Sequence, residues 1–313
     1  MTVLARLLLI GVCIFWGMAI KTDDPKRFSP WSTPTSLGAV VNTAGNDSGP
    51  CISKDGLSLY FNSDSLGGYG NLDIFVSHRD SVDQPWGPPQ NLGPNINSSL
   101  ADNAPVLSND EHWLYFQSTR PGGFGGQDLY VARRHNQRDD LNWEPAVNLG
   151  NVVNTPANEG APVYFEDDKT GTVSLYLYSN RPGGLGGADI YVSVRQPDET
   201  WGAPVLVEEL SSSSSDIQAA VRRDGLEMFV TSNRPGSYSS LADIWVSTRE
   251  STSDPWSTPV NPGSVINSPT PYFQGRPSIS SDGTALYFYA YRPGGFGVQD
   301  LYVSTRTKLK GDD

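Results

Sequence analysis

The sequence has few cysteines and few histidines, which narrows its chemistry. It contains 2 cysteines and 3 histidines in 313 residues. Cys13 lies in an apolar N-terminal segment, so only Cys51 remains beyond it and no intrachain disulfide is expected. The histidines occupy different positions in the repeat described below, which argues against a metal site built from histidine. An apolar core must therefore hold the chain together.

Positive charge is also scarce. The 22 Lys and Arg residues are outnumbered by 34 Asp and Glu residues, which gives a formal net charge of −12. Such a balance disfavours nucleic acid and an anionic membrane surface as partners. Cations, cationic proteins and neutral glycans remain as candidate ligands.

Long hydrophobic runs are absent apart from one near the start of the chain, from Leu7 to Ile20. This run is short for a membrane-spanning helix and typical of the apolar region of a secretory signal peptide. Gly17 and Ala19 supply the small residues that favour cleavage after position 19. We expect residues 1–19 to be a signal peptide, with an uncleaved anchor as the alternative. The protein is then exported to the periplasm, the cell surface or the medium, with no integral membrane domain beyond the leader.

No segment shows a helical period, and the 32 glycines instead recur in a repeat. The stretch SNRPGGLGGADIYVSVR at residues 179–195 has counterparts in four other parts of the chain. In every copy an aspartate opens the last strand pattern, and the copies are 54 to 61 residues apart: Asp73, Asp128, Asp189, Asp243 and Asp300. Units of this length accommodate four short strands with their turns.

Each unit has the same order of segments. A Trp-Pro segment comes first, and three segments that alternate apolar and polar residues follow, as in LYFQS and DLYVA. Asp-Gly between the first two of these predicts a tight hairpin. The tryptophans that mark the units are Trp31, Trp86, Trp143, Trp201 and Trp256.

Four antiparallel strands repeated five times, with no room for crossover helices, predict an all-β, five-bladed β-propeller over residues 31–306. A charged tail follows at residues 307–313. The first Trp segment has no strands before it, and the fifth copy has no Trp segment after it. The N-terminal strand is therefore expected to join the last blade and close the ring.

The unit P-x-x-S-x-D-G, LYF-x-S, R-P-G-G-x-G-G-x-D-I-Y-V-S resembles the TolB-type WD-like propeller repeat, in a variant found in bacterial envelope proteins. The resemblance covers about residues 31–306. It implies a propeller fold and a range of functions, since such propellers serve as protein-docking platforms, ligand sites and occasional enzymes.

The glycine motif itself could suggest a phosphate-binding loop. Such a loop needs its glycines between a strand and a helix, and here they lie between two strands with no lysine after them. We expect a structural role instead, in which the nearby Asp caps loop amides and accepts hydrogen bonds from the Arg that opens the motif. Copy one has Ser65 in place of this Arg, which in the other copies is Arg120, Arg181, Arg234 or Arg292.

A second recurring set lies at the entry of the innermost strand of each blade. These positions would surround one mouth of the central channel and are Asp47, Asp102, Glu159, Asp216 and Gln274. One interpretation is structural: each acid caps loop amides or pairs with a glycine-motif Arg as a latch between blades. The others are functional: a calcium site, or a pair of carboxylates that hydrolyses a glycoside.

Departures from the repeat indicate where a ligand would bind. Copy five places Tyr272, Phe273 and Arg276 where the other copies have small or polar residues, and copy four carries the serine run 211–215. Aromatic faces beside carboxylates and an Arg suit a sugar or a peptide segment. We expect both irregularities to lie near the ligand-facing mouth.

Together these observations predict a monomeric ligand- or protein-binding scaffold at the cell envelope, with an envelope protein or a glycan as partner. The binding face is expected at the acidic mouth of the channel. No cofactor is expected, with calcium as the alternative. The alternative function is a glycoside hydrolase that uses two of the residues Asp47, Asp102, Glu159 and Asp216.

Overall fold

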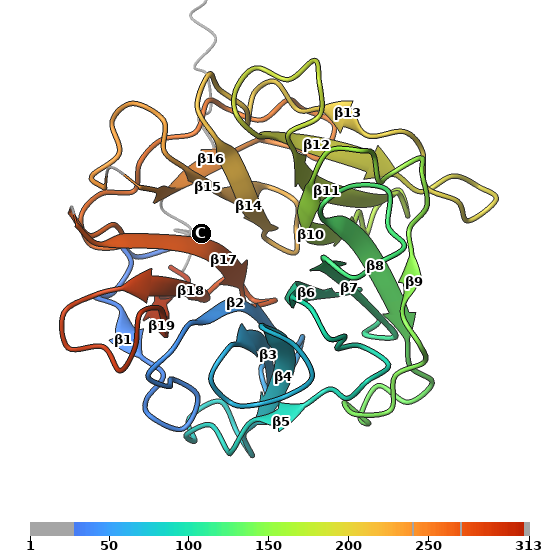
Figure 1. Cartoon of the computed structure of the whole chain (residues 1–313). Coiled ribbons are helices and arrows are strands. Elements are labelled where there is room, and N and C mark those ends of the chain that lie inside the picture. Colours follow the sequence, from blue (N-terminus) through green and yellow to red (C-terminus); the bar gives the residue numbers. More distant parts are fainter. Residues whose placement is uncertain (1–27, 240, 270, 310–313) are drawn as a thin grey trace, which may run out of the picture.

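The computed structural model describes residues 28–239, 241–269 and 271–309. Five antiparallel sheets surround a central channel, and the first strand of each blade lines that channel (Figure 1). The predicted all-β, five-bladed propeller is confirmed. The described residues form no helix that is long and apolar enough to cross a membrane. The expected leader lies outside the described residues.

The strands of each blade follow one another from the channel outwards, with ordinary antiparallel pairing. Blade 1 has β2 (Asp47–Ile52), β3 (Ser58–Ser63), β4 (Asp73–His78) and β5 (Gln90–Asn91); blade 2 has β6 (Asp102–Leu107), β7 (Trp113–Ser118), β8 (Asp128–Arg133) and β9 (Val147–Asn148); blade 3 has β10 (Glu159–Glu166), β11 (Val173–Ser179), β12 (Asp189–Val194) and β13 (Val205–Leu206); blade 4 has β14 (Asp216–Val221), β15 (Glu227–Ser232) and β16 (Asp243–Thr248); blade 5 has β17 (Phe273–Ile279), β18 (Ala285–Tyr291), β19 (Asp300–Thr305) and β1 (Thr35–Ser36).

The ring closes as the sequence predicts. β1 pairs with β19, with Thr35 opposite Val303 and Ser36 opposite Tyr302. Near this seam the Arg306 guanidinium lies 4.2 Å from the centre of the Trp31 ring. The first Trp segment thus completes the last blade.

The outer strands are short, with two residues each in blades 1, 2, 3 and 5. In blade 4 the outer strand is reduced to one bridge, in which Val246 and Val260 exchange two backbone hydrogen bonds of 2.8 Å. The outer tryptophans compensate, because four of them stack on an Arg that follows the third strand. The pairs, with guanidinium-to-ring distances, are Arg79–Trp86 at 4.3 Å, Arg134–Trp143 at 4.7 Å, Arg249–Trp256 at 4.1 Å and Arg306–Trp31 at 4.2 Å.

Every inner strand contains a bulge, two residues after its entry residue (Asp47, Asp102, Glu159, Asp216 or Gln274). At that residue the backbone has a positive φ, and a register shift accompanies it in each blade. Only blade 1 uses glycine there; the five residues and their φ values are Gly49 at 64°, Ala104 at 62°, Ala161 at 46°, Gln218 at 50° and Arg276 at 49°. Such bulges turn the strand where it enters the crowded channel.

The apolar core lies mostly between neighbouring blades. One cluster joins Tyr60 and Ile74 of blade 1 to Leu114 and Phe116 of blade 2. Another joins Phe61 of blade 1 to blade 5. Since each blade buries its faces against the next, the ring needs no disulfide, and Cys51 is a buried free thiol.

Candidate functional site

The residues at the entries of the inner strands are completely buried, each with an exposed fraction of 0%. In blade 2, Asp102 Oδ2 accepts a hydrogen bond of 2.5 Å from the Ser98 amide. Its Oδ1 accepts one of 2.7 Å from Arg120 Nη2. Arg120 also donates to the Ile96 carbonyl oxygen. The pair therefore fastens the entry of the inner strand within one blade.

Blades 3 and 4 repeat this arrangement. Glu159 accepts hydrogen bonds from the Thr155 amide at 2.7 Å and from Arg181 Nη2 at 3.2 Å. Asp216 accepts from the Ser212 hydroxyl at 2.7 Å and from Arg234. These ion pairs lie within a blade, so they are not latches between blades.

Blades 1 and 5 each lack one partner of this pair. Asp47 accepts two hydrogen bonds from Thr43 at its Oδ2, but Ser65 stands where the Arg would be, and Asp47 Oδ1 has no hydrogen-bond partner of normal geometry among the described residues. Burial raises the pKa of Asp47 above its ordinary value. In blade 5 the partner of Arg292 is Gln274 by position, and burial lowers the pKa of Arg292.

Gln274 has a reason to be neutral. Its Nε2 donates to Asp243 Oδ1 at 2.8 Å and to the Ala242 carbonyl oxygen at 3.3 Å, which joins blade 5 to blade 4. A carboxylate at position 274 would instead face the carboxylate of Asp243. The amide thus replaces the connection that the glycine motif makes between other blades.

The aspartates that open the third strands cap the glycine loops, as expected. The expected bond from the glycine-motif Arg to these aspartates is wrong, because the Arg reaches the inner-strand acid instead. In all five blades this Asp accepts the amide of the residue at the loop tip: Tyr69 on Asp73 at 2.5 Å, Phe124 on Asp128 at 2.6 Å, Leu185 on Asp189 at 2.9 Å, Tyr238 on Asp243 at 2.5 Å and Phe296 on Asp300 at 2.9 Å.

The glycines allow each loop to lie against the next blade. A Cβ on Gly125 would come within 1.8 Å of the Ala157 carbonyl oxygen, and one on Gly186 within 1.8 Å of the Ser214 carbonyl oxygen. Parallel bridges follow at the same contact: Asn46–Gln299, Leu72–Ala101, Gln127–Asn158 and Ala188–Ser215. The glycine motif therefore forms the backbone contact between neighbouring blades. The sequence analysis did not predict this role.

The loop tips carry a feature that the sequence analysis missed. Their side chains are apolar in every copy and about half exposed: Tyr69 52%, Phe124 47%, Leu185 50%, Tyr238 46% and Phe296 48%. All five lie between the second and third strands and so on the face where the inner strands begin. We call them the tip ring. The signal was available, because the variable position after Gly-Gly or Gly-Ser is aromatic or leucine in every copy.

The irregular aromatic residues of copy five pack within their own blade, whereas the serine run of copy four contacts blade 3. Phe273 packs edge-on against Tyr289, with ring centres 6.1 Å apart, and Tyr272 lies against Tyr291 at 5.6 Å. In the serine run, Ser211 accepts a hydrogen bond from the Ile190 amide at 3.1 Å. Arg276 is one of the residues that line the cavity described next.

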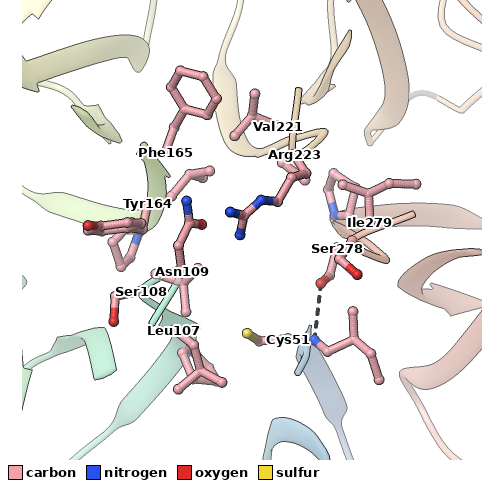
Figure 2. Close-up of a pocket in the computed structure, with 18 of the residues that line it drawn as sticks. Cys51, Leu107, Ser108, Asn109, Tyr164, Phe165, Val221, Arg223, Ser278 and Ile279 are labelled. Atoms are coloured by element: carbon pink, nitrogen blue, oxygen red, sulfur yellow. Dashed lines mark hydrogen bonds between the residues drawn. The ribbon is translucent and has the colours of Figure 1, made fainter. Parts of the chain in front are cut away.

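This cavity lies in the central channel and has a volume of about 130 Å³. Its walls include the ends of the inner strands and the turns that follow them, where Lys54, Glu111 and Arg223 stand. The cavity is therefore at the opposite end of the channel from the entry carboxylates. Figure 2 shows the Arg223 side chain extending into the middle of the opening and the Cys51 sulfur facing the space. Glu111 is the one carboxylate among the described residues that line it.

The described residues contain no group of three or more His, Cys, Asp or Glu side chains that could hold a metal ion. The entry carboxylates belong to separate blades, and three of them, Asp102, Glu159 and Asp216, each pair with the Arg of their own blade. Whether they contact a ligand stays a prediction.

Comparisons with known proteins agree with the fold. No protein-family model and no curated protein sequence matches the chain. An α-L-arabinofuranosidase from Lactobacillus brevis has a similar structure, with a TM-score of 0.56 and 17% identity over 85% of this chain and 92% of its own. A GH62 hydrolase solved with xylotriose gives a TM-score of 0.58 and 10% identity over 90% of this chain and 98% of its own. TolB from Acinetobacter baumannii gives 0.46 and 12% over 84% and 55%.

At these identities the similarity shows the fold alone, and the TolB comparison adds no argument of its own. A propeller fold is supported. The specific TolB-type repeat variant stays a prediction from the sequence motif.

Proposed function

We propose that the protein is a non-catalytic binding scaffold of the cell envelope that docks a protein partner on the tip ring. One observation carries the proposal. In each of the five blades an aspartate holds the amide of the tip residue, while the apolar side chain of that residue stays about half exposed.

Rigid presentation matters for binding. A tip whose backbone is already fixed loses little conformational entropy when a partner contacts it. Exposed aromatic and aliphatic side chains that recur on one face are typical of protein-binding surfaces. The net charge of −12 already favours solubility, and exposed aromatic and aliphatic side chains do not add to it. The envelope location rests on the N-terminal leader expected from the sequence.

Capture from envelope extracts tests the proposal. Two baits are compared: the unaltered protein and a variant in which serine replaces all five tip-ring residues. A control replaces three apolar residues of the outer strands that are more exposed than the tips: Val147 at 63%, Val205 at 65% and Val260 at 63%. We expect the tip variant to lose the partner and the outer-strand variant to keep it. Equal capture by all three proteins would contradict the proposal.

Glycoside hydrolysis is the second candidate, and the geometry favours it less. A glycosidase needs two carboxylates that face the sugar. Here the four entry carboxylates have no exposed surface, and three of them hold an Arg. A panel of glycans, assayed with the unaltered protein and with Asp102→Asn, tests this candidate: absence of turnover on every substrate would exclude it.

A further inference from the structure

Arg276 is a buried cation without a counter-charge. Its exposed fraction is 5%, its Nη1 is buried without a hydrogen-bond partner, and no carboxylate among the described residues pairs with it. Other buried arginines are all paired. These are Arg134 with Asp140, Arg234 with Asp216, and Arg222 and Arg306 with Glu227.

An unpaired guanidinium is costly in such a place. Removing a charge from water without a partner costs a free energy comparable to the net stability of a domain. Burial lowers the pKa of Arg276 to about 10, so the side chain still carries its charge at neutral pH. Its backbone φ of 49° adds local strain. The equivalent bulges of blades 1 and 2 use the small residues Gly49 and Ala104. An Arg at this position therefore lowers stability unless a bound group balances its charge.

The position of Arg276 indicates where that group would bind. Arg276 stands at the bulge of β17 and is one of the residues that line the channel cavity. At the equivalent bulge the other blades place Gly49, Ala104, Ala161 and Gln218, most of which have little side chain. Gln218 Oε1, at the equivalent position of blade 4, is likewise buried without a hydrogen-bond partner among the described residues.

We propose that the channel cavity binds a small monocarboxylate with an apolar body, whose carboxylate pairs with the Arg276 guanidinium. One buried positive charge is balanced by one negative charge, whereas a dianion such as phosphate would bury an excess charge. The planar guanidinium also matches a carboxylate with two parallel hydrogen bonds.

The cavity walls fit the apolar body of such an acid. Val106, Leu107, Val163 and Phe165 are among the lining residues, together with the Cys51 side chain. A cavity of about 150 Å³ holds a benzene molecule, and this one measures about 130 Å³. The apolar body of the acid is therefore no larger than the ring of benzoate or the chain of a short fatty acid.

The mouth of the cavity favours an anion. Two cations line it, Lys54 and Arg223, against one acid. Arg223 is partly neutralised by Asp168, with 3.0 Å between Nη2 and Oδ1. Glu111 turns one oxygen to the Lys54 amide at 2.6 Å. The remaining positive charge raises the local concentration of anions in an otherwise acidic protein.

This site lies at the opposite end of the channel from the tip ring and does not depend on the proposed docking function. Titration calorimetry with sodium benzoate at constant ionic strength tests it, with benzamide as the uncharged probe of the same shape. Arg276→Gln removes the charge and copies the side chain found at position 218 in blade 4. Arg133→Gln, which removes an exposed cation outside the cavity, is the control.

We expect benzoate to bind at least tenfold more tightly than benzamide, Arg276→Gln to weaken benzoate at least tenfold, and Arg133→Gln to bind as the unaltered protein does. Equal binding of benzoate and benzamide, unchanged binding by Arg276→Gln, or no binding of benzoate would overturn the proposal. Tighter binding of inorganic phosphate than of benzoate would overturn the carboxylate assignment. If Arg276→Gln does not fold, the comparison of the two probes on the unaltered protein still decides.

Discussion

The carboxylate of Asp128 accepts a hydrogen bond of 2.6 Å from the Phe124 amide, while the Phe124 side chain stays 47% exposed. The same aspartate accepts a bond of 3.0 Å from the Gly125 amide. The buried carboxylate therefore orders a loop whose outermost side chain contributes little to folding. Asp128 is thus assigned to stability and Phe124 to binding, and the two roles can be tested separately.

Replacement of Asp128 by Ala should destabilise the protein, because two loop amides lose their acceptor. We expect a loss of about 2 kcal/mol or more in the free energy of unfolding, measured in urea. Phe124→Ser serves as the control and should change that free energy by less than about 0.5 kcal/mol, since the side chain is half exposed. A larger effect for Phe124→Ser than for Asp128→Ala would show that the tip is a packing residue.

The entry carboxylates should differ in their contribution to stability according to their partners. Asp102→Asn leaves Arg120 without its counter-charge, and we expect a loss of about 2 to 3 kcal/mol because Arg120 is only 16% exposed. Asp47→Asn should be neutral or stabilising at pH 7, because no Arg faces Asp47. Urea unfolding of the two variants measures the difference. Equal losses would mean that the Arg partner is unimportant.

Asp47 should also produce a pH dependence of known sign. Burial raises its pKa above the ordinary value of 3.8, so the folded state binds a proton more tightly than the unfolded state. The stability that Asp47 contributes is therefore present below the ordinary pKa and lost as pH rises through the folded pKa. Relative to the unaltered protein, Asp47→Asn should gain stability as pH rises from 3 towards 7. Unfolding free energies measured across this range would contradict the argument if that difference stayed constant or fell.

The contact between blades makes a further prediction. A Cβ at Gly125 would lie 1.8 Å from the Ala157 carbonyl oxygen, which is backbone of the next blade. Gly125→Ala should therefore cost about 1 to 3 kcal/mol, as overpacking does. Gly126→Ala is the control, because its Cβ meets only the Asn158 side chain, at 2.8 Å. Thermal unfolding of the two variants measures the cost, and equal melting temperatures would contradict the close contact.

Much of the fold could be predicted from the sequence because the repeat encodes it locally. The aspartate spacing gives five blades, and the unpaired Trp31 segment gives the closure. The bulges could not be predicted, because a positive φ is normally expected at glycine and here Ala104, Ala161 and Arg276 adopt it. Tertiary crowding in the channel imposes that conformation, and it has no local signature.

The candidate site was harder to predict for a related reason. Spacing along the chain places Arg120 8 residues before Asp128 and 18 residues after Asp102, and proximity in sequence favoured the nearer acid. The sheet register decides otherwise, because Ser118 pairs with Asp102 and brings the following Arg over the inner strand. Likewise the cavity depends on which inner-strand residues face one another, which a repeat alignment does not reveal.

The central claim is that the protein binds its partner through the tip ring. It is tested most directly by a photo-crosslinking phenylalanine analogue placed at position 124 in living cells, with position 147 on an outer strand as the control. We predict that one macromolecule is crosslinked to position 124 and that the same macromolecule is not crosslinked to position 147. A crosslink from position 147 without one from position 124 would contradict the account.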